Sequence, residues 1–220
     1  MVPPSLRGRL ALIAGFAALT VIVLGVLYAG HSRPGSVDRW FIAPTADSVR
    51  PPWRYVALAL DFFGEPAGSA LVVAAAVAGC LLRRRPRAAV FVVAGAGLTV
   101  VATTLLKSLV GRTIHGADNL SYPSGHTAFA TALALMAALL AIRRLGLGRT
   151  AGTSLVLAAP LVAGAAMGWA QVALGAHYPT DALGGWCTAL VVVPVTAWLV
   201  DRVADRLAGR TADAGPRGPR

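Results

Sequence analysis

The chain has little charge for its length, few aromatic residues and almost no cysteine. Charged residues make up 13% of its 220 residues, against about 25% in soluble domains. Hydrophobic residues make up 56%, and the mean hydropathy is +0.68. Several apolar runs approach or exceed ~18 residues, the length that crosses a bilayer as a helix. This composition excludes an ordinary soluble domain and predicts an all-α polytopic membrane protein.

The scarcity of cysteine also limits the chemistry. Cys80 and Cys187 lie in separate apolar runs, without the spacing of a metal or redox motif. We therefore expect two packed thiols, with no disulfide and no cysteine metal site. The net charge of +11 does not indicate nucleic acid as a partner, because the basic residues occur in short clusters between apolar runs. Cytoplasmic loops of membrane proteins have this pattern.

Six spanning helices are predicted, at about residues 10–29, 55–82, 88–106, 124–142, 151–174 and 179–200. Residues 1–54 would hold the first helix and an outer loop, irregular or partly amphipathic over 31–54. Residues 55–201 would form the membrane core, and 202–220 a polar tail that is disordered at its end. With both termini in the cytoplasm, 14 of the 20 basic residues fall on the cytoplasmic side, as the positive-inside rule favours.

The second spanning segment contains two acidic residues. Asp61 and Glu65 lie four residues apart, beside a bend expected at residues 64–66. We expect them to lie at the membrane interface or to mark a helix break, and this explanation is favoured over a role in binding substrate. No acidic cluster is expected to offer metal ligands, so the sequence predicts neither a metal nor a cofactor.

The fourth predicted helix begins with a short polar motif on the extracytoplasmic face. Ser124 is a good N-cap, and Gly125 allows the backbone to approach a ligand closely. The free N–H groups and the helix dipole favour an anion there. His126 would project from the first turn. The motif therefore predicts an anion site with a proton donor beside it.

Two other polar segments share this face. Asp181 would lie in the first turn of the last helix, near enough to His177 to hold one imidazole nitrogen and free the other to attack phosphorus. His126 could protonate the leaving oxygen and then activate water. Lys107 and Arg112, which end the third helix, would stabilise the phosphoryl oxygens. Each residue alone has a commonplace explanation as a solvated, capping or anchoring group, so only their joint occurrence indicates a site.

These motifs resemble the signatures of the type 2 phosphatidic acid phosphatase (PAP2) superfamily. Pro123–His126 matches the second signature in full, Gly175–Asp181 matches the end of the third, and Lys107–Arg112 matches the start of the first. The resemblance covers roughly residues 60–200. It implies a helical core like that of acid phosphatases and vanadium haloperoxidases. It also implies that His177 is the nucleophile, Asp181 its orienting partner and His126 the general acid. Phosphate would be bound by Lys107, Ser124 and Gly125.

Two arginines of the family signatures are missing. The Arg-Pro of the first signature would fall at Ile114 and His115, and the Arg of the third at Gln171. We expect Arg112 to substitute for one of them, while His115 and Gln171 donate neutral hydrogen bonds to the phosphate.

The resemblance implies an integral-membrane phosphatase, with the lipid bilayer and a lipid phosphate as its partners. It would hydrolyse a lipid phosphate or pyrophosphate monoester at the extracytoplasmic face through a phosphohistidine, without metal. Candidate substrates are a polyprenyl phosphate or pyrophosphate, a polyprenyl-linked sugar phosphate, phosphatidic acid and phosphatidylglycerophosphate. The composition, rich in Ala, Arg and Gly, is typical of a high-GC bacterium.

Two alternatives stay open, and the oligomeric state is not indicated. The first is a degenerate family member that binds a phospholipid or a membrane partner without turnover, which Ile114 and Gln171 favour. The second is a small transporter or channel subunit. Transporters place charged or broken segments near the bilayer midplane, whereas the polar residues of this chain gather at one surface.

Overall fold

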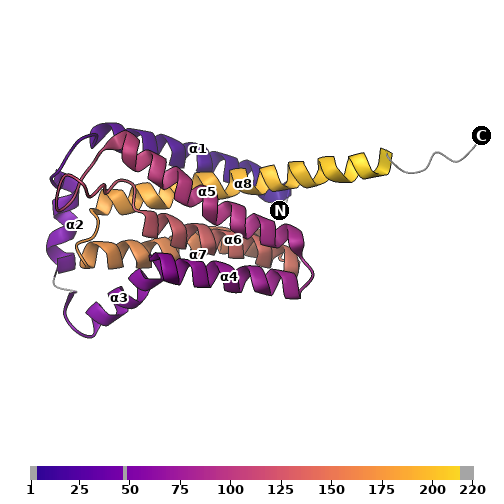
Figure 1. Ribbon diagram of the computed structural model, residues 1–220, viewed down its shortest axis with the longest axis horizontal. Helices are drawn as coiled ribbons and strands as arrows, with labels where there is room; N and C mark the ends of the chain where they lie inside the picture. Colours follow the sequence, from indigo (N-terminus) through magenta and orange to yellow (C-terminus); the bar gives the residue numbers. More distant parts are fainter. Residues whose placement is uncertain (1–3, 47–48, 214–220) are drawn as a thin grey trace, which may run out of the picture.

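The computed structural model describes residues 4–46 and 49–213, and it is helical with short connections. Figure 1 shows the long helices packed side by side in a bundle. The helices of the described residues are α1 (Pro4–Leu27), α2 (Ser36–Ala46), α3 (Trp53–Gly64), α4 (Pro66–Leu82), α5 (Pro86–Val110), α6 (Gly125–Leu145), α7 (Arg149–Ala173) and α8 (Pro179–Asp213).

Five helices are long and apolar enough to cross a membrane, namely α1, α5, α6, α7 and α8. The pair α3 and α4 also qualifies as one broken span, bent by 66°. The bend lies where expected: α3 ends at Gly64, Glu65 is extended, and Pro66 occupies the first turn of α4. A proline is tolerated there because its missing N–H would have no partner within the helix. The prediction of an all-α membrane protein is confirmed, with five spans, or six when the bent pair is counted as one.

The core lies around α6, the most enclosed of the five spans. Its Leu135, Met136 and Leu139 are fully buried against neighbouring helices. Large apolar side chains such as Phe16 and Val162 point outward and are exposed. Outward-facing apolar side chains suit a helix bundle surrounded by lipid, where the backbone hydrogen bonds are satisfied inside each helix.

The connections bring three polar segments to one end of the bundle. Because neighbouring spans alternate in direction, the C-terminal ends of α5 and α7 meet the N-terminal ends of α6 and α8. Figure 1 shows these ends beside α2 and α3, whereas α1 begins and α8 ends at the opposite end. The three polar segments that were expected on one face therefore do lie at one end of the fold.

Two regions differ from the expectation. The segment 31–54, expected to be an irregular or partly amphipathic loop, contains the helix α2. The last helix continues to Asp213 instead of ending near Val200, so residues 202–213 of the expected tail are helical. No Gly or Pro interrupts residues 195–208, and Arg87 of α5 contacts Asp201 and Asp205 at 3.5 and 3.4 Å. Residues 214–220, where disorder was expected, lie outside the described residues.

Candidate active site

The predicted N-cap at Ser124 is confirmed. Its buried hydroxyl oxygen accepts hydrogen bonds from the backbone N–H and the hydroxyl of Thr127, at 3.3 and 3.1 Å. The N–H of Ser124 donates to the carbonyl of Asp181 at 2.9 Å. A Cβ atom on Gly185 would overlap the Ser124 carbonyl, so this glycine permits the contact. The start of α6 is thus joined directly to the first turns of α8.

His126 follows this cap and faces the bend between α3 and α4. Its Nε2 lies 3.4 Å from Oδ1 of Asp61 and 3.7 Å from Oε1 of Glu65. It has no hydrogen-bond partner among the described residues. A Cβ atom on Gly64 would overlap the imidazole ring, so the bend and the histidine pack against each other closely. The acidic pair lies at the helix break, as expected, and there it also contacts His126.

Asp61, Glu65 and His126 also form a set of potential metal ligands. One ligand atom from each lies within 4.8 Å of the others, and no second such group of His, Cys, Asp and Glu occurs in residues 4–46 and 49–213. Carboxylate oxygens and an imidazole nitrogen are ligands that Zn²⁺ and Mn²⁺ accept. The expectation that no acidic cluster offers metal ligands is therefore wrong, because the helix bend brings His126 to a carboxylate pair distant in sequence.

Gln171 has other partners than the expected phosphate. Its side chain is 1% exposed. The amide Nε2 donates a hydrogen bond of 2.7 Å to Oδ1 of Asp61, and it also contacts Sδ of Met167 at 4.0 Å. The residue that replaces a family arginine is thus a neutral donor to a carboxylate. Because position 171 is a glutamine, it supplies no positive charge to balance the carboxylates of Asp61 and Glu65.

His177 and Asp181 lie next to each other at the start of α8. The distance between His177 Nδ1 and Asp181 Oδ2 is 3.8 Å, too long for a hydrogen bond. The same Oδ2 accepts from the N–H of Tyr178 at 3.0 Å, and His177 Nδ1 has no hydrogen-bond partner among the described residues. Catalytic hydrogen bonds are often long before substrate binds, so this geometry is compatible with the predicted pair.

Arg112 is fully buried in a network of charged groups. Its Nη1 donates to Asp181 Oδ1 at 2.7 Å and to the Thr180 hydroxyl at 2.6 Å, and its Nη2 donates to Asp38 Oδ2 at 2.6 Å. The guanidinium also lies over the rings of Tyr28 and Tyr178. The structure therefore does not support Arg112 as a phosphate ligand, because its side chain has no exposed surface and both Nη atoms donate to protein groups.

Asp38 of α2 was not singled out from the sequence, yet it belongs to this network. Burial raises its pKa. Hydrogen bonds from Thr180, Gly35 and Arg112 outweigh that effect and hold the pKa below the ordinary value of 3.8. Asp38 is therefore a carboxylate near neutral pH, and Arg112 is shared between two negative charges.

Lys107, at the end of α5, lies near His126. Its Nζ donates to the carbonyl of Leu120 at 2.7 Å, and both Lys107 and His177 are near enough to His126 to interact with it electrostatically. Lys107 and the two histidines therefore occupy one neighbourhood, as predicted. Ile114 is buried, while Nε2 of His115 is hydrogen-bonded to the Gly175 carbonyl at 2.7 Å, so neither replaces the missing cation.

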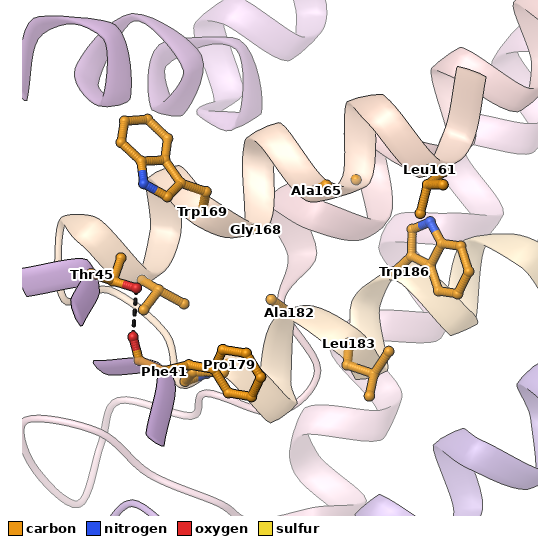
Figure 2. Close-up of a pocket in the computed structure, with 12 residues that line it drawn as sticks. Phe41, Thr45, Leu161, Ala165, Gly168, Trp169, Pro179, Ala182, Leu183 and Trp186 are labelled. Atoms are coloured by element: carbon orange, nitrogen blue, oxygen red, sulfur yellow. Dashed lines mark hydrogen bonds between the residues drawn. The ribbon is translucent and has the colours of Figure 1, made fainter. Parts of the chain in front are cut away.

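An apolar cavity of about 400 Å³ lies beside the start of α8. Figure 2 shows Phe41 of α2, Trp169 of α7, and Pro179 and Trp186 of α8 around it. The predicted catalytic and phosphate-binding residues do not line this cavity. It is thus a separate apolar space next to the turn that carries Asp181.

A family model for the PAP2 superfamily matches residues 9–205 of the chain. The chain belongs to the PAP2 superfamily. One similar solved structure is that of "the first transmembrane PAP2 type phosphatidylglycerolphosphate phosphatase from Bacillus subtilis". It superposes with a TM-score of 0.66 at 20% identity, covering 88% of this chain and 96% of that chain. No curated protein matches the chain. The structural likeness shows that this PAP2 protein has the fold of a membrane PAP2 enzyme.

Proposed function

We propose that this PAP2 protein is an integral-membrane phosphatase. It would hydrolyse a lipid phosphate or pyrophosphate monoester at the extracytoplasmic face. The observation that carries the proposal is that the helix ends with Lys107, His126 and His177 meet at one end of the bundle, beside the capped N-terminus of α6. The similar fold of a Bacillus subtilis phosphatidylglycerolphosphate phosphatase supports it.

In the proposed mechanism, His177 attacks the phosphorus atom with an imidazole nitrogen. A P–N bond forms as the P–O bond to the lipid breaks, and His126 gives a proton to the leaving oxygen. Water then attacks the phosphohistidine, His126 takes a proton from it, and the P–N bond breaks to release phosphate. The carboxylate of Asp181 would stabilise the positive charge that develops on His177.

Electrostatic stabilisation of the phosphoryl group would come from Lys107 and from the free N–H groups at the start of α6. Arg112 adds little, because its charge is balanced by two carboxylates. Asp61 and Glu65 place further negative charge beside His126. We therefore expect phosphate to bind more weakly than in a PAP2 protein with both signature arginines.

The apolar cavity near Pro179 supports a lipid substrate. It is lined almost entirely by apolar side chains, and it adjoins the turn between His177 and Asp181.

Phosphate release from a panel of lipid phosphates tests the proposal. Purified protein in detergent should release phosphate from at least one lipid phosphate or pyrophosphate, and the variant His31→Ala, changed outside the proposed site, should match it. A chelator should leave the rate unchanged, because no step uses a metal. Lipid binding without release would support the non-catalytic alternative and refute the phosphatase. Strong inhibition by the chelator would show that Asp61, Glu65 and His126 hold a required metal.

The variant Gly64→Ala should reduce the rate of phosphate release. The added methyl group would overlap the His126 ring, so the ring must move, and misplacement of a catalytic group by ~1 Å can cost about 100-fold. Kinetic assays of the variant check this. Gly97→Ala is a matched control, because a Cβ atom there meets no neighbouring atom. Equal rates for the two variants would contradict the placement of His126 as the acid.

The variant Gln171→Arg tests where the missing cation would act. We expect little change in KM from it alone, because Asp61 lies 2.7 Å from the Gln171 amide and would pair with the new guanidinium. Adding Asp61→Asn should lower KM by about 10- to 100-fold, since a charge-assisted hydrogen bond contributes about 1.5–3 kcal/mol. A full decrease in KM from Gln171→Arg alone would show that Asp61 does not compete with phosphate.

A further inference from the structure

Asp38 is a buried carboxylate supplied by a helix that lies outside the spanning segments. Its side chain has no exposed surface. It accepts hydrogen bonds from the Thr180 N–H at 3.0 Å, the Thr180 hydroxyl at 2.8 Å, the Gly35 N–H at 2.9 Å and Arg112 Nη2 at 2.6 Å. Burying a charge is costly unless it is paired and hydrogen-bonded. Asp38 meets both conditions, and two of these four hydrogen bonds come from Thr180 at the start of α8.

The contact with Thr180 fixes the turn that carries the proposed nucleophile. Thr180 lies between His177 and Asp181, and Asp38 accepts both its N–H and its hydroxyl. An acceptor for a free N–H in the first turn of a helix acts as a cap. For α8 this acceptor comes from a different helix, α2. The backbone between the two proposed catalytic residues is therefore held by Asp38.

The ion pair between Asp38 and Arg112 determines how much of the negative charge on Asp181 the guanidinium balances. The guanidinium is divided between the two carboxylates, with Nη2 directed to Asp38 and Nη1 to Asp181. The three groups together carry one net negative charge. If Asp38 were neutral, Arg112 would cancel the charge of Asp181, and Asp181 would no longer attract the positive charge that develops on His177.

We propose that Asp38 is a positioning residue for the His177–Asp181 pair and acts through the Arg112 that it shares with Asp181. The proposal rests on the phosphatase function proposed above. It makes α2, which precedes the part of the chain that carries the family signatures, a component of the active site.

A double-mutant cycle separates this role from a general loss of stability. Asp38→Asn keeps the shape of the side chain and removes its charge. It should lower kcat at least tenfold with KM within about twofold, whereas Asp118→Asn, an exposed carboxylate at the same end, should match the wild type. In an Asp181→Asn background, Asp38→Asn should change kcat by less than twofold. If Asp38→Asn lowers kcat by the same factor in both backgrounds, or leaves kcat unchanged in the wild-type background, the proposal is overturned.

A spectroscopic measurement tests the proposal independently of turnover. Histidine labelled with ¹⁵N, with His177→Gln used for assignment, reports which imidazole nitrogen carries the proton. The wild type should hold His177 in the tautomer with the proton on Nδ1, and Asp38→Asn should give a mixture. An unchanged tautomer would overturn the role of Asp38. If the wild-type protein hydrolyses no lipid phosphate, the proposed function fails, and this comparison still decides the role of Asp38.

Discussion

The variant His177→Ala should abolish phosphate release, with a loss of roughly 10⁴- to 10⁶-fold, the range seen when a nucleophile is removed from a catalytic unit. His177 is 9% exposed and lies at the start of α8 beside Asp181. A covalent intermediate on this imidazole would gain from the neighbouring carboxylate, which stabilises the positive charge on the ring. Phosphate release by wild type and variant, measured in the same detergent, checks the loss.

The intermediate itself should be trapped by changing the acid. With a pyrophosphate substrate, whose leaving group needs little protonation, His126→Ala should still form the P–N bond but lose the activation of water. The variant should therefore accumulate an acid-labile phosphoenzyme, and the double variant His126→Ala, His177→Ala should not. An acid-labile phosphoenzyme formed by the double variant would exclude His177 as the nucleophile. Phosphate release by His177→Ala at close to the wild-type rate would exclude it too.

The variant Arg112→Leu should destabilise the protein by about 3–5 kcal/mol, the usual effect of removing one partner from a buried ion pair. Arg112, Asp38 and Asp181 all have side chains without exposed surface. In the variant, the buried carboxylates of Asp38 and Asp181 lie beside an apolar leucine side chain, with no cation between them. Thermal unfolding in detergent checks the prediction as a large decrease in the melting temperature.

Two comparisons identify the cause of that decrease. Arg54→Leu, a change at an exposed arginine, should alter stability by less than about 0.5 kcal/mol, as surface substitutions usually do. Neutralising the carboxylates as well, with Asp38→Asn and Asp181→Asn added to Arg112→Leu, should recover part of the loss. If Arg112→Leu unfolds at the wild-type temperature, the buried charge network is not a source of stability.

The spans could be predicted because each one depends on local composition. A run of about 20 apolar residues forms a helix in a membrane wherever it occurs, since the backbone must satisfy its own hydrogen bonds. The N-cap at Ser124 and the bend at residues 64–66 are local for the same reason: their causes lie within a few residues of their effects. The alternation of helix direction then placed Lys107, His126 and His177 at one end of the bundle.

The partners of the charged residues could not be predicted, because they lie far apart in the sequence. Arg112 was expected at the phosphate, yet it lies between Asp38 and Asp181. Gln171 was expected there too, yet it donates to Asp61. A loose signal existed for Asp61, in its spacing of four residues from Glu65 at a helix break. Nothing local marked Asp38, an acidic residue in a polar loop segment.

The sequence by itself determined the membrane class, the number of spans and the end of the bundle at which the signature histidines lie. Hydropathy and helix capping act over short stretches of chain, so these features follow from composition and order. Only the tertiary structure decided which charges meet: Arg112 with Asp38 and Asp181, and His126 with Asp61 and Glu65. Such pairs form because a buried charge must find a partner, and the packing of the helices determines which partner is within reach.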